Sequence, residues 1–166
     1  MKKLLILFIT FCIIGCSNIQ NKTEVDVVID CPRVFFSSEN NIFIDGNKED
    51  LDLDLDKINY KAALNNYGFV DDCISSTDYK IFNLELLILV EPINPNKTII
   101  NMPIFALLYN SQNEIIDRQY FKVKSSLNYN SEISKYEITD VNTRINILVG
   151  SERKVDSITI GFVNIN

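Results

Sequence analysis

Aspartate alternates with leucine over residues 50–56, directly after Glu49, and this acidic segment (residues 49–56) is the first candidate for chemistry in the 166-residue chain. Carboxylate oxygens are the ligands that hard cations such as Ca²⁺ prefer. Alternate side chains of a strand lie about 6.5 Å apart on one face, which is too far for all of them to hold one ion. We therefore expect a strand with a solvated acidic face and no metal ion. Four residues are kept as candidate ligands: Asp50, Asp52, Asp54 and Asp56.

Catalysis has little support in the residue types present. The chain has no histidine, which is the commonest general base near neutral pH and a common metal ligand. It contains no nucleophile-elbow, metalloprotease, P-loop or dinucleotide motif. Paired carboxylates can hydrolyse glycosides, but among 22 acidic residues any pair could be nominated. We expect no enzymatic activity and no catalytic residue.

Length and composition narrow the class of protein. A chain of 166 residues fits one domain with a substantial core. Hydrophobic residues at 46% and charged residues at 23% are ordinary values for a globular protein. The formal net charge of −6 argues against nucleic acid as a partner, because phosphate binding needs a basic surface.

The N-terminus has the form of an export signal. Lys2 and Lys3 precede an apolar run over residues 4–14. As a helix this run would rise only about 16 Å, roughly half of a bilayer core, so it suits an export signal and not a membrane span. The run ends in Ile13-Ile14-Gly15-Cys16, which resembles the lipobox of bacterial lipoproteins. An ordinary secretory signal with a coincidental cysteine is the alternative.

The lipobox resemblance implies a covalent lipid anchor. In that family the cysteine thiol, here of Cys16, receives a diacylglycerol, the chain is cut before it, and the new amino group is usually acylated. Two or three acyl chains together hold a protein firmly on a membrane. The expected organisation is a signal peptide over residues 1–15, a lipidated tether over 16–24 and a folded domain over 25–166. In that family a serine directly after the lipidated cysteine allows sorting to the outer membrane. Ser17 therefore favours anchoring on the periplasmic face of the outer membrane, with the inner membrane or the cell surface as alternatives.

The remaining cysteines follow from export. Cys12 leaves with the signal peptide and Cys16 carries lipid, so Cys31 and Cys73 are the pair left in the mature chain. In an oxidising periplasm such a pair is expected to form one disulfide bond. A redox or metal site is the alternative, but the chain has neither a Cys-x-x-Cys spacing nor a histidine to support it.

Most of the folded region has the composition of β-strands, since Ile, Val, Phe and Tyr are punctuated by Asn, Asp, Ser and Gly. The apolar run over residues 79–90 places Leu84, Leu86, Ile88 and Val90 on one face, and Leu87 and Leu89 also fill the other. This pattern predicts a central strand. The other expected strands are 27–29, 33–36, 42–44, 58–64, 72–75, 104–109, 115–123, 135–141, 143–149 and 157–165. Residues 92–102 and 124–134 are expected loops, and residues 110–113 a hairpin turn.

About eight or nine short strands with frequent turns predict an all-β fold, an antiparallel β-sandwich that is immunoglobulin-like in architecture. A small β-barrel is the alternative. Four tyrosines either form a surface for a ligand or partner or, more commonly, pack as ordinary strand residues. They are Tyr109, Tyr120, Tyr129 and Tyr136.

A second resemblance covers most of the mature chain. Its residues are Cys31-Pro32-Arg33-Val34 after the lipobox, Cys73 before the long apolar strand, and Pro103-Ile104-Phe105-Ala106 leading into a hairpin. Together they are similar to a group of small uncharacterised Gram-negative lipoproteins with Cys-Pro-Arg near the mature N-terminus. The likeness implies a location, a β domain and a structural cysteine pair, and it carries no activity.

The sequence therefore predicts a non-enzymatic lipoprotein whose only cofactor-like group is the covalent lipid on Cys16. We expect it to dock an envelope protein through exposed edge strands, in envelope assembly or maintenance. The alternative is a module that binds a small ligand, a glycan or a cation. Such a module would use the loops at 92–102 and 124–134 or the acidic segment.

Overall fold

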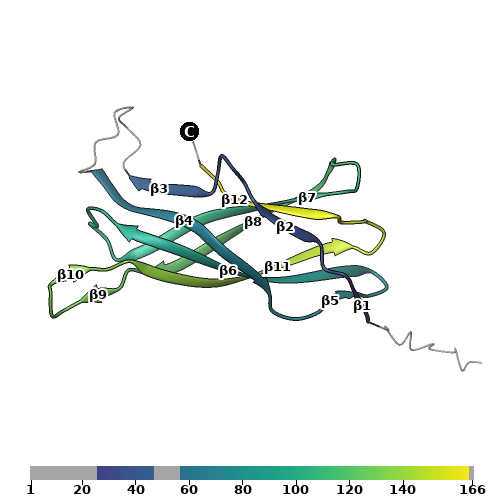
Figure 1. Cartoon of the computed structure of the whole chain (residues 1–166), viewed down its shortest axis with the longest axis horizontal. Helices are drawn as coiled ribbons and strands as arrows, with labels where there is room; N and C mark the ends of the chain where they lie inside the picture. The colour runs from purple at the N-terminus through teal and green to yellow at the C-terminus, as the bar shows by residue number, and fades with distance from the viewer. Residues whose placement is uncertain (1–25, 47–56, 165–166) are drawn as a thin grey trace, which may run out of the picture.

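The computed structural model describes residues 26–46 and 57–164, and nearly all of the regular structure in these ranges is β-strand (Figure 1). In these ranges no helix is both long enough and apolar enough to cross a membrane. The predicted signal peptide, the tether and the acidic segment 49–56 lie outside the described residues.

The strands form two sheets that share one core (Figure 1). The larger sheet has the order β1 (Val27–Ile29), β5 (Cys73–Ser75), β6 (Tyr79–Pro92), β4 (Ile58–Phe69) and β3 (Ile42–Gly46), and β11 (Thr139–Gly150) also pairs with β6. The smaller sheet has the order β2 (Arg33–Phe36), β12 (Ser157–Phe162), β7 (Ile99–Tyr109) and β8 (Ile115–Ser126). A separate hairpin joins β9 (Tyr129–Asn130) to β10 (Lys135–Tyr136). In the described part of the chain, every pair is antiparallel except β2 with β12.

Alternate residues of the two long central strands make the core. Because side chains of a strand point alternately to its two faces, one face is apolar from Phe82 to Val90 on β6 and from Ile100 to Leu108 on β7. The inward face of residues 79–90 and their central place in the sheet are confirmed, since β11 lies on one edge of β6 and β4 and β5 lie on the other. The buried residues on β6 are Phe82, Leu84, Leu86, Ile88 and Val90, and those on β7 are Ile100, Met102, Ile104, Ala106 and Leu108.

The all-β sandwich predicted from the sequence is confirmed. Within the described residues no strand pairing joins the larger sheet to the smaller one. An immunoglobulin domain arranges its strands as ABED and CFG. In this protein β3, β4 and β6 lie side by side in one sheet, and along the chain only the short β5 intervenes between β4 and β6. The likeness to immunoglobulin domains is therefore one of layers and not of connectivity.

β7 begins at Ile99, inside the predicted loop 92–102, and it contains Pro103. A proline interrupts a strand ladder only where its missing N–H was needed. The Pro103 carbonyl accepts a hydrogen bond from the Val163 N–H at 2.9 Å, so the backbone of Pro103 faces the β12 side. The pairing of β12 with β7 ends at Ile104, so the missing N–H of Pro103 falls just beyond that ladder, while Pro103 keeps its place opposite Lys122 of β8.

The C-terminal strands also have ends that differ from the prediction. The predicted strands 135–141 and 143–149 are the short β10 and one continuous β11. Asn142 does not break β11, because it points to the exposed face, where a polar side chain is tolerated. β8 continues to Ser126 and β9 follows, both within the predicted loop 124–134, while β12 already ends at Phe162.

A disulfide bond joins Cys31 to Cys73, as the sequence predicts, with their Cα atoms 5.3 Å apart. Cys31 lies where the chain leaves β1 in the larger sheet for β2 in the smaller one, and Cys73 begins β5. The bond spans 42 residues, and closing such a loop stabilises a fold by about 4 kcal/mol in the chain-entropy model. It fastens the first crossing between the sheets to a residue that is 1% exposed.

Tyr60 of β4 connects the two sheets through hydrogen bonds. Its hydroxyl donates to the Asn101 carbonyl of β7 at 3.0 Å and accepts from the Asn101 N–H at 3.1 Å. Burial raises the pKa of Tyr60 to about 12, with the charge of Asp45 adding to the rise and the hydrogen bond to the Asn101 backbone opposing it. The neutral phenol is therefore the form that the folded protein holds.

This shift predicts a loss of stability at high pH. An unfolded tyrosine ionises near pH 10, whereas Tyr60 in the fold ionises near 12. The contribution of Tyr60 is therefore complete below about pH 10 and is lost as the pH rises towards 12. Urea unfolding between pH 7 and 11.5 should show this decline, and Tyr60→Phe should flatten it while costing about 1 kcal/mol at pH 7.

Tyr120→Phe is the matched control, because Tyr120 is 68% exposed. That variant should keep the full decline in the free energy of unfolding. An unchanged decline in Tyr60→Phe would show that another group causes it.

Candidate functional site

Most of the predicted site residues lie outside the described ranges. These are the lipidation site and the candidate cation ligands: Cys16, Asp50, Asp52, Asp54 and Asp56. Within residues 26–46 and 57–164, no group of three or more Asp, Glu, Cys or His side chains is placed to hold a metal ion. Cys31 and Cys73 are the predicted site residues that the described ranges contain, and they form the disulfide bond.

The two predicted binding loops are held against the domain by their own contacts. In the first, the Ile93 N–H donates to the Asn59 carbonyl at 2.9 Å, and the Lys97 ammonium lies 3.0 Å from the Asp45 carboxylate. In the second, β9 and β10 pair as a small hairpin. The candidate site that the structure offers lies instead on the sheet surface.

The four tyrosines considered as a shared surface are distributed over several elements. Tyr129 and Tyr136 pack edge to face within the β9–β10 hairpin, with ring centroids 5.1 Å apart. Tyr109 is half-buried on β7, and Tyr120 stands exposed on β8. Among the described residues, ring contact joins only the first two of these four, so the tyrosines do not form one aromatic site.

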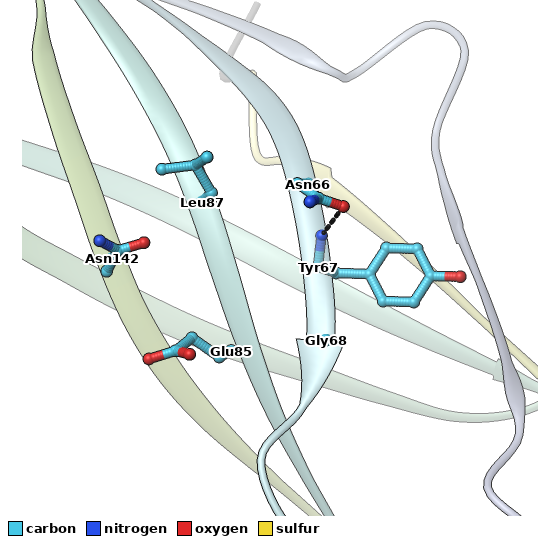
Figure 2. A pocket seen from close by; sticks show the side chains of 6 residues that line it. All are labelled: Asn66, Tyr67, Gly68, Glu85, Leu87 and Asn142. Carbon is cyan, nitrogen blue, oxygen red and sulfur yellow. Dashed lines mark hydrogen bonds between the residues drawn. The ribbon is translucent and has the colours of Figure 1, made fainter.

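A pocket of about 300 Å³ opens on the outer face of the larger sheet (Figure 2). Its volume is at the lower end of the range of small-molecule sites, about 300–1,000 Å³. Three neighbouring strands line it, and Asn66 and Asn142 lie on either side of Leu87 in the sheet register. The lining residues are Asn66, Tyr67 and Gly68 of β4, Glu85 and Leu87 of β6, and Asn142 of β11.

A β-bulge creates this pocket. The register of β4 against β6 slips by one residue between Leu64, which pairs with Ile88, and Asn66, which pairs with Leu87. A one-residue slip moves every later side chain to the opposite face. Asn66 and Gly68 therefore point outward, where the preceding alternation would have put them in the core. Gly68 has no side chain to fill the space, and apart from Gly68 itself and its two chain neighbours no residue has an atom within 4 Å of where its Cβ would be.

The polar groups around the pocket balance in charge. The Glu85 carboxylate lies 3.5 Å from the Arg144 guanidinium on β11. The side-chain oxygen of Asn66 accepts a hydrogen bond from the Tyr67 N–H at 2.9 Å, which leaves its NH₂ group to donate elsewhere. The side chain of Asn142 is exposed and makes no hydrogen bond within the described residues. These groups offer donors and acceptors to a neutral polar ligand rather than to an ion.

The apolar part of the pocket is small. Leu87 supplies the floor between the two asparagines (Figure 2). The Tyr67 ring points away from the pocket and packs edge to face on Phe36, with centroids 5.8 Å apart. A ligand would therefore meet amide groups, a carboxylate and one leucine, without an aromatic ring to stack on. Hydroxyl groups and C–H groups together are the chemistry of a neutral sugar.

Two long strands form open edges on the same side of the sandwich. Within the described residues, β8 pairs only with β7 and β11 only with β6. The Gln119 amide on β8 donates to the Leu148 carbonyl on β11 at 2.7 Å, and the Arg153 guanidinium donates to the Ile116 carbonyl at 2.7 Å. These hydrogen bonds connect the first half of β8 to β11 and to the turn that follows β11. The second half of β8, residues 120–126, continues beyond them.

Comparisons with protein-family models, with curated proteins and with solved structures find no match for this chain. Sequence reasoning missed the pocket, because its residues are common types with no motif spacing. The available signal is the loss of apolar alternation after Leu64, where the polar residues Asn65 and Asn66 precede Gly68.

The bulge geometry predicts opposite effects for two glycine substitutions. Gly68→Val should leave the fold as stable as before or up to about 1 kcal/mol more stable, because its side chain enters open space in a strand. Gly161→Val should cost about 1–3 kcal/mol, because a Cβ there would meet the Phe105 ring and Asn40. Urea unfolding of both variants measures the difference. Equal losses would contradict the outward placement of Gly68.

Proposed function

We propose that this protein is a lipid-anchored envelope protein, held on the periplasmic face of the outer membrane through Cys16, that works by contacts with other proteins. The lipobox Ile13-Ile14-Gly15-Cys16 supports the anchor. The disulfide between Cys31 and Cys73 is in keeping with an oxidising compartment. A non-enzymatic role agrees with the absence of histidine from the sequence.

The two open edges on one side of the sandwich carry this proposal. β8 and β11 each run for 12 residues, and each pairs with one neighbour in the described structure. An unpaired strand edge presents rows of N–H and C=O groups that a partner strand can take up. A stable two-layer core behind the edges keeps those groups in a fixed line. Docking of a partner in envelope assembly or maintenance is the role that this surface suits.

The anchor and the protein contacts are tested together on protein made in its own cells. Cross-linking before lysis, followed by detergent extraction and intact mass measurement, should give a mature chain with acyl chains on Cys16 and cross-links to envelope proteins. Cys16→Ser should abolish the lipid mass, and Cys12→Ser, the matched control, should keep it because Cys12 precedes the cleavage point. An unprocessed chain in the cytosol, or a lipidated chain without protein cross-links, would refute the corresponding half of the proposal.

The pocket favours a second candidate function, the binding of a neutral glycan unit. The observation that supports glycan binding is the pair of exposed side-chain amides, Asn66 and Asn142, on either side of Leu87. Amide groups can donate to and accept from sugar hydroxyls, and the leucine contacts the C–H face of the ring.

Thermal unfolding in millimolar maltotriose or chitotriose tests the glycan candidate. Binding should raise the melting temperature of the wild type. Gly68→Val should abolish that rise, because the added side chain fills the pocket, and Asn146→Ala on the same outer face, outside the pocket lining, should keep it. No rise with either sugar in the wild type would remove this candidate.

A further inference from the structure

A line of cations stands on the outer face of β8. Arg118, Lys122 and Lys124 occupy alternate positions with Tyr120 between the first two, and all four side chains are exposed. None of the three cations takes part in an ion pair within residues 26–46 and 57–164. The whole chain has a formal net charge of −6, so three neighbouring unpaired cations on one strand form a positively charged patch on an acidic protein.

The residues beside this line are apolar. In the register of β7 with β8, Leu107 lies across from Arg118, Phe105 from Tyr120, and Pro103 from Lys122. These β7 side chains are half-buried on the same outer face. The cations therefore have an apolar strip on one side and the open edge of the sheet on the other.

Resting on the proposed function, we propose that the β8 edge binds an extended, acidic segment of a partner protein that adds to the smaller sheet as a strand. Alternate residues of a strand are about 6.5–7 Å apart, which is the spacing of Lys122 and Lys124, and Arg118 lies two such steps from Lys122. An added strand with Asp or Glu at every second position would place a carboxylate beside each of the three cations and another beside Tyr120. Cross-strand pairs of opposite charge stabilise such a pairing.

The cations on β8 also determine which strands pair poorly with its open edge. Lysine on an edge strand discourages pairing between copies, since a second β8 would bring cations against cations. A neutral strand would gain main-chain hydrogen bonds without ion pairs. β11, the other long edge, offers no such line, because its Arg144 is paired with Glu85 and Asp140 lies on the same face. Charge complementarity therefore selects an acidic partner for β8 in particular.

Peptide binding to the mature protein, extracted in detergent, tests this proposal. The probe is a nine-residue peptide that alternates glutamate with threonine, with glutamine and lysine versions as comparison. The glutamate peptide should bind tightest and weaken as salt rises. Changing Arg118, Lys122 and Lys124 together to Gln should raise its Kd about tenfold, since each exposed ion pair contributes a few-fold. Lys61→Gln on the larger sheet is the control and should leave the Kd unchanged.

Amide hydrogen exchange locates the bound peptide. Protection should increase along β8 and not along β11, and a glutamate peptide with N-methylated alternate residues should lose it. Protection of β11, or a Kd that ignores the triple change, would overturn the proposal. Capture of anionic phosphatidylglycerol vesicles by the cation line, with no capture of the peptide, would also overturn it in favour of a lipid surface. If envelope cross-links persist unchanged in the triple variant, the proposed function stands and this inference fails.

Discussion

The facing apolar sides of β6 and β7 are the constraint on which the rest of the structure depends. Every second residue of each strand is buried, from Phe82 to Val90 on one and from Ile100 to Leu108 on the other. Because strand geometry alternates, the remaining residues must point outward. Burial of the inner faces therefore determines which residues lie on the outer faces. The pocket at Leu87 lies on the outer face of the larger sheet, and the cations of β8 lie on the outer face of the smaller sheet, next to β7.

Two kinds of bond hold these layers in register. Tyr60 joins β4 to the backbone of β7 through its hydroxyl, so the sheets cannot slide past each other without breaking two hydrogen bonds. The disulfide between Cys31 and Cys73 fastens the chain where it first passes from one sheet to the other. Neither bond involves a residue of the long edge strands β8 and β11. The edges are thus free of internal ties along most of their length, yet rest on a fixed support.

The sequence predicts the layers well and the surfaces poorly, for a physical reason. Alternation in residues 79–90 shows which side chains are buried, because burial is a property of a single strand. The pocket depends on a slip between Leu64 and Asn66, which exists only once β4 is paired with β6. The spacing of Arg118, Lys122 and Lys124 is visible in the sequence, but that β8 lies at an edge follows from the order of strands. Local sequence patterns do not contain information on which distant strands pair, and both of these surfaces depend on that pairing.

The parallel pairing of β2 with β12 has a consequence for the timing of folding. β2 is the second strand that the structure describes and β12 is the last one described, and Arg33 and Asp156 also pair across 123 residues. The chain is synthesised from its N-terminus, so β2 stays unpaired with β12 until nearly all of the intervening residues have been made. Pairing over such a long sequence separation is slow. Completion of the smaller sheet by β2 and β12 is therefore a late step of folding, and a chain that lacks β12 leaves β2 without its neighbour in that sheet.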